Sequence, residues 1–295
     1  MLDGMSATHD TNPPLDLDPL PRGVILAATP LGNVGDASPR LRHALATADV
    51  VAAEDTRRVR NLATALGVEI RGKVVSNFDH NEAARSEGLL ESARSGSVVV
   101  VTDAGMPLVS DPGHSLVDAA HEAGVSVTCI PGPSAVPTAL ALSGLNVGHF
   151  IFDGFAPRKA GARRTWLESL RAEKRAVCFF ESPHRVHETL LEAAEILGDS
   201  RRAAVCRELT KTYEEVRRGT LPELAEWAAG GVKGEVTVVL EGGAGEAAEP
   251  EELVPAVEKQ VADGVRLKDA CKAVAGRYGV SNRELYEAVL MARGR

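Results

Sequence analysis

The chain has 295 residues, of which 44% are hydrophobic and 25% charged, and these fractions are typical of a globular protein. Its length suffices for two domains and a small third one. The formal net charge of −8 argues against a nucleic-acid partner. This argument holds only if the charge is evenly spread along the chain. The four cysteines lie far apart without a C-x-x-C pair, which favours reduced thiols in a cytoplasmic protein over disulfides or a metal site.

The first segment, residues 1–21, contains four prolines and several acids but neither a basic start nor an apolar stretch. This composition predicts a disordered tail rather than a signal peptide. No later segment approaches the roughly 18 apolar residues that a membrane-spanning helix needs, so we expect no membrane partner.

From residue 22 to 131, short β-branched runs alternate with segments of helical period. Strands are predicted at 24–29, 49–54, 73–78, 97–103 and 125–132. Helices are predicted between them at 38–48, 56–66, 80–95 and 112–123. Ser38 is the expected N-cap of the first helix, with Pro39 at its first position. The alternation predicts an N-terminal α/β domain with a mostly parallel sheet covered by helices on both faces.

A second α/β domain is predicted at 132–242, after a proline-rich boundary. The runs at 201–210 and 214–220 can pair antiparallel, so this half mixes strand directions. A flexible acidic linker is expected at 243–252. Residues 253–295 carry three short helical patterns, and a capping box at Ser281 begins the last one. These patterns predict a small helical domain that resembles a helix-turn-helix bundle.

Four loops rich in glycine and proline follow predicted strands, at 29–36, 102–113, 131–135 and 233–237. Each alone could be an ordinary turn, but together they favour a ligand site, since open α/β sheets bind ligands at the carboxyl ends of their strands. Glycine lets a backbone approach a ligand closely, and proline fixes the shape of the loop. The loops are poor in basic residues and lack a P-loop pattern. We therefore expect a neutral or zwitterionic ligand with an adenine and a ribose rather than a polyphosphate.

Seven segments together resemble the tetrapyrrole methylase superfamily: ATPLGNVGD, AAEDTR, SNFDHNE, TDAGMPLVSDPG, PGPSA, FFESPHR and RELTKTYEEVRRGTL. Within it, EDTR and ELTK resemble the branch that methylates the ribose 2′-hydroxyl of a cytidine in the 16S ribosomal RNA of the small subunit. The resemblance runs from about Gly23 to Gly242 and implies a cytoplasmic homodimer of class III methyltransferase-like subunits. Each subunit would hold S-adenosylmethionine in a cleft between its two α/β domains.

The resemblance also implies which residues surround the methyl donor. They lie on the strand-end loops and on two later strands: Pro30, Asp103, Ala104, Gly105, Pro107, Ser110, Pro131, Gly132, Pro133, Ser134, Ala135, Phe180 and Thr237. Met106 departs from the small or β-branched residue that relatives often have, which leaves the fine shape of the pocket open.

The chemistry of methyl transfer from a sulfonium is an in-line displacement, so positioning supplies much of the rate. Because a ribose hydroxyl is a weak acid, a base or a cation beside the developing alkoxide is also expected. The candidates come from AEDTR and RELTK: Glu54, Asp55, Arg57, Glu208 and Lys211. A helix-start carboxylate with an exposed arginine explains the first segment as well as catalysis does, and Lys211 could equally be a surface lysine.

The basic segment, residues 157–175, reverses the charge of the chain locally, with seven cations against two glutamates. Charge runs are usually solvated helix faces, but this reversal favours phosphate contacts. The cations are Arg158, Lys159, Arg163, Arg164, Arg171, Lys174 and Arg175. Trp166 could stack on a base, although packing is the commoner fate of a tryptophan.

Other functions compete with this interpretation. His184 and His187 alone form at most half of a metal site, so we expect no metal. Methylation of a tetrapyrrole on the same scaffold would have no need for the basic segment. A non-catalytic RNA-binding factor in ribosome assembly would bind RNA without binding the donor.

Overall fold

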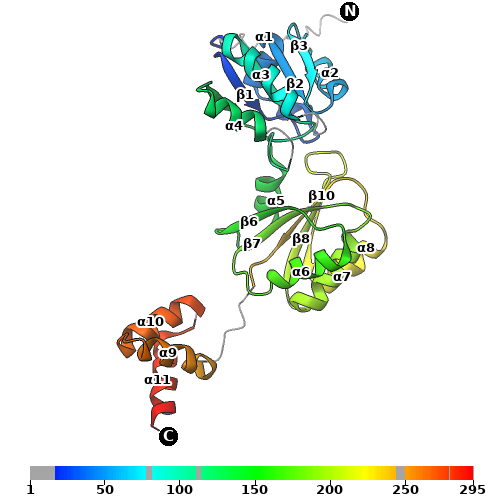
Figure 1. The fold of residues 1–295 in the computed structure, drawn as a ribbon. Coiled ribbons are helices and arrows are strands. Elements are labelled where there is room, and N and C mark those ends of the chain that lie inside the picture. The colour runs from blue at the N-terminus through cyan, green and yellow to red at the C-terminus, as the bar shows by residue number, and fades with distance from the viewer. Residues whose placement is uncertain (1–16, 78–81, 111–113, 244–249, 279, 295) are drawn as a thin grey trace, which may run out of the picture. The chain divides into compact units, whose positions relative to one another are not determined.

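The computed structural model describes residues 17–77, 82–110, 114–243, 250–278 and 280–294. Contacts divide the chain into two units, Met1–Ala135 and Val136–Arg295. Figure 1 shows the order of their elements. Most of the expected tail and linker, residues 1–16 and 244–249, lies outside the described residues.

The first unit contains a five-stranded sheet in the order β3-β2-β4-β1-β5, and every neighbouring pair is parallel. Its strands are β1 (Gly23–Ala27), β2 (Val50–Ala53), β3 (Lys73–Ser76), β4 (Ser97–Val101) and β5 (Val127–Ile130). The connections contain the turn η1 (Val34–Asp36) and the helices α1 (Pro39–Thr47), α2 (Thr56–Ala65), α3 (Glu82–Ser95) and α4 (His114–Glu122). The predicted parallel sheet is confirmed.

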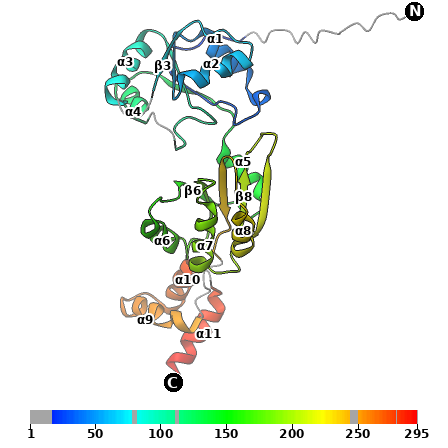
Figure 2. The same ribbon diagram turned by 90° about the vertical axis from the view of Figure 1, so that its right-hand side faces the viewer.

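The central strand β4 contributes to the cores on both faces of this sheet. Val99 and Val101 pack in the core beside α1 and α2, while Val98 and Val100 pack in the core beside α3 and α4. Figure 2 shows the two helix pairs on opposite sides of the sheet. A run of four valines is the expected sequence for a strand that is buried on both faces.

The second unit begins with a mixed sheet in the order β6-β7-β10-β8-β9. Its strands are β6 (Phe150–Phe155), β7 (Ala176–Glu181), β8 (Arg202–Arg207), β9 (Glu215–Thr220) and β10 (Val236–Leu240). β6 and β7 are parallel, whereas β10 is antiparallel to both β7 and β8. The predicted antiparallel pairing of β8 with β9 is confirmed.

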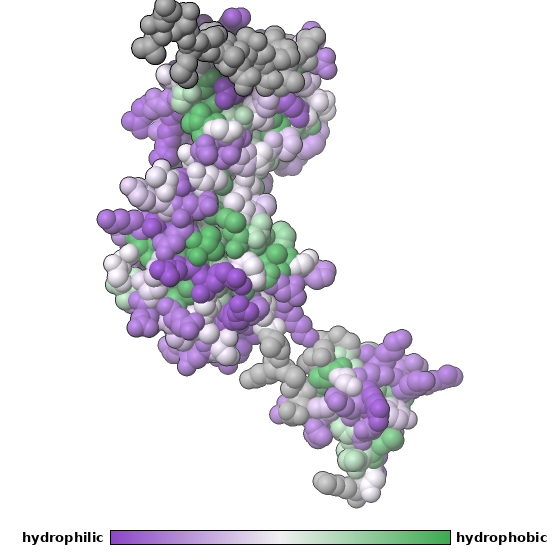
Figure 3. Space-filling model, turned by 180° about the vertical axis from the view of Figure 1, so that it is seen from behind, coloured by the Kyte–Doolittle hydropathy of each residue, from purple (hydrophilic) through white to green (hydrophobic). Residues whose placement is uncertain are grey.

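Helices cover both faces of the second sheet. The elements are α5 (Ala135–Ser143), α6 (Ala160–Ser169), α7 (Val186–Leu197) and α8 (Leu221–Ala229). The last three bury the main core of the unit on one face. On the other face, the thiol of Cys206 lies 3.9 Å from the carbonyl oxygen of Ala139 in α5. Seen from behind, the second unit also carries hydrophobic surface between hydrophilic borders (Figure 3).

The C-terminal part contains the three predicted helices, preceded by a short turn. They are η3 (Pro250–Leu253), α9 (Val254–Ala262), α10 (Leu267–Tyr278) and α11 (Asn282–Arg293). Val257, Cys271 and Leu285 are fully buried in their common core. Ser281 caps α11 by accepting a hydrogen bond from the amide of Glu284 at 3.4 Å. None of the described helices combines the length and apolar character that crossing a bilayer requires.

The four cysteines are free thiols, and Cys178, Cys206 and Cys271 are buried. Burial raises the pKa of Cys178 to about 12 and that of Cys206 to about 11. These two thiols therefore stay protonated and unreactive at neutral pH.

Candidate functional site

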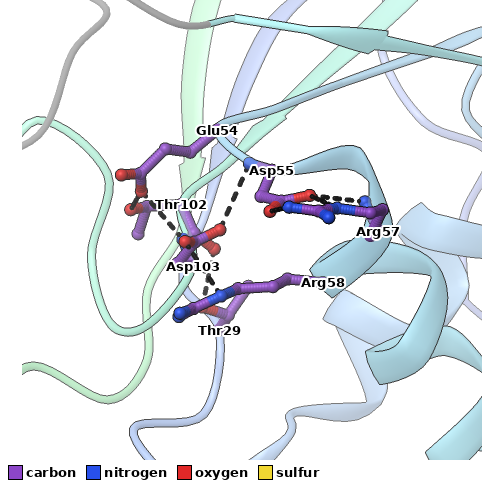
Figure 4. A network of polar contacts seen from close by, with 7 residues as sticks. All are labelled: Thr29, Glu54, Asp55, Arg57, Arg58, Thr102 and Asp103. Atoms are coloured by element: carbon purple, nitrogen blue, oxygen red, sulfur yellow. Dashed lines mark hydrogen bonds and ion pairs between the residues drawn. The ribbon is translucent and has the colours of Figure 1, made fainter.

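Three neighbouring strands of the first unit end in polar residues that contact one another. β1 leads to Thr29, β2 leads to Glu54 and Asp55, and β4 leads to Thr102 and Asp103. Because β2, β4 and β1 are adjacent and parallel, their carboxyl ends meet at one edge of the sheet. Figure 4 shows these side chains as one network.

The carboxylate of Glu54 links the end of β2 to the end of β4. One of its oxygens accepts hydrogen bonds from the hydroxyl of Thr102 at 2.8 Å and from the amide of Asp103 at 3.2 Å. The hydroxyl of Thr29 donates to the carbonyl oxygen of Thr102 at 3.1 Å, which links the end of β1 to the same point. Glu54 thus holds the start of the loop that follows β4.

Asp103 is the carboxylate at the centre of the network. Burial raises its pKa, the negative charge of Glu54 raises it further, and Arg58 opposes both. The Arg58 Nε lies 3.3 Å from one Asp103 oxygen, and the amide of Asp55 donates to the other at 3.2 Å. Sequence reasoning missed Arg58, although its place in the first turn of α2, beside the predicted Arg57, was a usable signal.

Asp55 and Arg57 pair with each other at the surface. The guanidinium of Arg57 lies 2.9 Å from Asp55, and its side chain is 85% exposed. Hydrogen bonds from the Arg57 side chain and amide lower the pKa of Asp55 to about 2. Asp55 is also the N-cap of α2, since it accepts the Arg57 amide at 2.8 Å. Asp55 and Arg57 therefore form the helix-start carboxylate with an exposed arginine that the sequence left open as the alternative to catalysis.

The loop after β4 adopts a backbone that side chains rarely tolerate. Gly105 has φ of 89°, and Leu108 and Ser110 have φ of 70° and 67°. Two left-handed residues other than glycine in one short loop indicate a conformation that its surroundings impose. The amide and carbonyl of Gly105 bond to the backbone of Thr29 at 3.1 and 2.9 Å.

The other predicted loops of the first unit approach Gly105 from two sides. A Cβ at Gly105 would lie 3.2 Å from the Leu31 side chain and 3.7 Å from the carbonyl oxygen of Pro133. A Cβ at Gly132 would lie 2.9 Å from the Ala28 side chain. The structure thus brings together the chain around Pro30, the loop with Asp103, Ala104, Gly105, Pro107 and Ser110, and the segment 131–135. Residues 111–113 of the motif lie outside the described residues.

Two predicted ligand residues lie in the second unit, on neighbouring strands. Thr237 of β10 is 5% exposed and pairs directly with Phe180 of β7. The Phe180 ring lies edge-on to the rings of Phe152 and Phe155, with centroids 5.0 and 5.3 Å away. The strand pairing therefore places Phe180 and Thr237 side by side.

Lys211 is held between two carboxylates at the end of β10 where the strand begins. Its ammonium lies 2.8 Å from Glu208 and 3.1 Å from Glu235. The Glu208 carboxylate also accepts a hydrogen bond from the backbone amide of Glu235 at 3.1 Å, which fixes it against the start of β10. The side chain of Lys211 is 28% exposed, so it is not the freely solvated lysine that the sequence left open. Sequence reasoning missed Glu235 because nothing in KGEVT marks its glutamate as a partner of ELTK.

The backbone around Lys211 is strained and closely packed. Glu208 and Thr210 have φ of 51° and 65°, and the Thr210 hydroxyl is buried without a hydrogen-bond partner among the described residues. Gly234 has φ of 87°, and a Cβ there would lie 2.3 Å from the Glu208 carboxyl, so a side chain would be strained and would displace that carboxyl. The left-handed residues and the buried, unpartnered hydroxyl distinguish this end of the sheet from an ordinary surface turn.

The charge state of Lys211 follows from these contacts. Desolvation lowers its pKa, but the hydrogen bonds to Glu208 and Glu235 outweigh desolvation and raise the pKa above its usual value. The same contact with Lys211 lowers the pKa of Glu208. Lys211 is consequently a cation at neutral pH and cannot serve as a base.

Comparisons with known proteins identify the family. Residues 23–225 match the sequence model described as Tetrapyrrole (Corrin/Porphyrin) Methylases. The chain belongs to this family. A relative from Mycobacterium tuberculosis named Ribosomal RNA small subunit methyltransferase I is 59% identical, over 92% of this chain and 95% of the relative. A relative of the same name from Halalkalibacterium halodurans is 43% identical, over 88% and 92%. This member of the tetrapyrrole methylase family is a methyltransferase.

Solved structures agree with this tetrapyrrole methylase fold. A diphthine synthase has a TM-score of 0.57 at 20% identity, covering 74% of this chain and 89% of that one. The methyltransferase CobJ has a TM-score of 0.56 at 21% identity, covering 75% and 95%. Identities this low support the fold alone.

Arg163 of the basic segment does not have the exposure that a phosphate contact requires. Its side chain is 1% exposed, and it pairs with Glu188 at 2.9 Å and Glu192 at 2.8 Å. It therefore joins α6 to α7, and we withdraw it from the expected RNA contacts of this tetrapyrrole methylase. Trp166 also packs inward, since its ring lies edge-on to Phe179 and its indole nitrogen donates to Asp153.

The other cations of the basic segment fall into two groups. Arg164 pairs with Glu195 at 2.6 Å and Arg175 with Glu173 at 2.7 Å. The rest are exposed and form no ion pair with a described residue: Arg158, Lys159, Arg171 and Lys174. These four are the cations available to a polyanion.

The two carboxylates around Lys211 generate a prediction about its reactivity. Glu235→Gln should lower the pKa of Lys211 and raise its rate of acylation at pH 8.5 by roughly three- to tenfold, because a pKa change of one unit changes the fraction of free amine tenfold. Mass spectrometry after brief labelling measures the rate, with the exposed Lys174 as internal control. A Lys211 rate equal to wild type would show that Glu235 does not hold its proton.

Proposed function

We propose that this methyltransferase transfers the methyl group of S-adenosylmethionine to the ribose 2′-hydroxyl of a cytidine in the 16S RNA of the small ribosomal subunit. The observation that carries the RNA substrate is the 59% identity, over nearly the whole chain, to a protein named Ribosomal RNA small subunit methyltransferase I. Identity of this extent favours RNA methylation over both tetrapyrrole methylation and a non-catalytic assembly factor. A cytoplasmic homodimer is part of the same proposal.

The donor site that we propose uses the strand-end loops of the first unit together with Phe180 and Thr237. Gly105 and Gly132 lack the Cβ atoms that would fill the space beside Leu31 and Ala28. Asp103 offers a partly buried carboxylate to hydroxyl or ammonium groups of the donor, and its neighbours hold it in place. Bound there, S-adenosylmethionine would supply an activated methyl group.

We assign the candidate catalytic residues different roles. Lys211 is the proposed cation that stabilises the developing alkoxide, since its two carboxylate partners keep it protonated and fixed. Glu208 and Glu235 position it. Glu54 is proposed to position the donor loop rather than to accept a proton, because one of its oxygens already accepts two hydrogen bonds.

The donor loop is tested by substituting one glycine. Gly105→Val should abolish donor binding, since the valine would be strained at φ of 89° and would meet Leu31. Gly67→Val is the matched control, because Gly67 has φ of 66° with nothing within 4 Å of its added Cβ. Calorimetry on both folded variants measures donor affinity. Equal affinities in the two variants would remove this loop from the donor site.

The position of the transferred methyl is tested by alkaline cleavage of RNA. Cleavage requires a free 2′-hydroxyl, so methylation at that oxygen makes one bond resistant. The substrate is the small subunit from a strain lacking the activity, and the ladder of its RNA is compared before and after incubation with protein and labelled donor. We expect one new gap, at a cytidine. A complete ladder with incorporated label would place the methyl on a base, and no label would favour the assembly factor.

The same ladder separates the role of Lys211 from a structural one. Lys211→Met should bind the donor with wild-type affinity. Its initial rate of methylation, measured as the appearance of the gap, should be about a hundredfold lower than that of wild type, because removal of one stabilising group typically has this effect. Lys211→Arg should recover part of that loss. Full activity of Lys211→Met would exclude its proposed role.

A further inference from the structure

A cavity of 760 Å³ opens in the second unit at the end of β10 opposite to Lys211. Its walls come from the turn after α6, the C-terminal end of α7 and the exit of β10, including Arg171, Lys174, Arg201 and Gly242. The five residues of β10 separate it from the Lys211 cluster by about 17 Å, at the usual rise of a strand. It is thus distinct from the site described above.

Arg201 places a buried positive charge on the wall of this cavity. The residue is 9% exposed, and its guanidinium donates to the backbone oxygens of Glu241 at 2.6 Å and Glu173 at 3.5 Å. Within the described part of the chain it has no ion pair with a carboxylate. Burial lowers the pKa of Arg201, although the negative charges of Glu241 and Glu173 act in the opposite direction. The printed hydrogen bonds of this guanidinium go to backbone oxygens, and neither nearby carboxylate pairs with it directly, so an anion in the cavity would be stabilised there.

Two exposed cations extend the positive charge to the rim. Arg171 and Lys174 line the cavity and form no ion pair with a described residue. Two glutamates line the cavity. Glu195 is paired with Arg164 at 2.6 Å, so Glu241 is the lining carboxylate that forms no ion pair with a described residue. Three cations therefore face one carboxylate that has no ion pair among the described residues.

The shape of the walls favours a phosphate over a base. Among the described residues no aromatic side chain lines the cavity, so they offer no stacking surface. Gly242 and Gly243 pack closely against the protein itself, since an added Cβ would lie 1.9 Å from the Lys174 carbonyl oxygen and 2.6 Å from the Arg201 guanidinium, respectively. Contacts from cations to phosphates position RNA without reading its sequence.

We propose that this cavity binds a backbone phosphate of the small-subunit RNA and anchors the substrate away from the reacting ribose. The proposal rests on the proposed function, because it takes RNA as the substrate. The anchor contributes affinity and salt dependence, and it contributes nothing to the choice of nucleotide.

The test is a charge reversal on the rim, R171E/K174E, against the matched control R71E/K73E. Both control residues are exposed, lie in the first unit and change the net charge by the same amount. At about 0.1 M salt, the cavity variant should bind small-subunit RNA at least tenfold more weakly than the control. Its log–log salt slope should be shallower by about 0.7, the contribution of the one phosphate that the cavity neutralises. Affinity for S-adenosylmethionine should equal that of wild type.

Three further results separate the possible failures. RNA of scrambled sequence should show the same fold-loss, and a loss confined to the native sequence would overturn a phosphate anchor. If wild type methylates RNA and the cavity variant binds it as the control does, the anchor alone is overturned. If wild type neither binds nor methylates RNA, both the proposed function and the phosphate anchor are overturned. The neutral variant R171Q/K174Q should show about half of the loss of RNA affinity, on a logarithmic scale, that R171E/K174E shows. This graded result would not be expected if R171E/K174E had simply misfolded.

Discussion

The contact on which the candidate site depends is the carboxylate of Glu54 between two strand ends. Parallel strands bring the ends of β2 and β4 together, but they do not fix the loops that leave them. Glu54 does so by accepting both the Thr102 hydroxyl and the Asp103 amide. With Asp103 held there, its carboxylate can meet Arg58, and the loop can turn back to pair Gly105 with Thr29.

This local order explains how strained residues persist in the loop. Left-handed conformations at Leu108 and Ser110 cost of order 1–3 kcal/mol each, and they survive only where surrounding contacts outweigh the strain. The backbone pair between Gly105 and Thr29 and the Glu54 hydrogen bonds are such contacts. A loop held in this way has its conformation without a ligand, which would lower the entropy lost on binding the proposed donor.

The sequence was sufficient for features that depend on short-range patterns. The valines of β4 predicted a doubly covered strand, and Ser38 with Pro39 predicted the start of α1, where the Ser38 hydroxyl accepts the Leu41 amide at 3.0 Å. Spacing could not reveal partners that the fold brings together. Arg163 looked like one cation among seven until α7 supplied its glutamates, and Glu235 meets Lys211 only because β8 and β10 pair.

The positive charges of this acidic chain therefore have separate functions that composition cannot distinguish. Arg163 joins two helices, Lys211 is held by two carboxylates, and Arg201 lines a cavity. Burial and pairing decide among these functions, and both are properties of the fold.

The central claim, that Glu54 holds the loop after β4 in its conformation, is tested most directly by amide hydrogen exchange in Glu54→Ala. The account predicts that the amides of Asp103 and Gly105 exchange at least about fivefold faster than in wild type, because a lost hydrogen bond to a charged group weakens local stability by about 1–3 kcal/mol. Amides in the middle of β1 should be unchanged. Exchange at Asp103 and Gly105 equal to wild type would contradict the account.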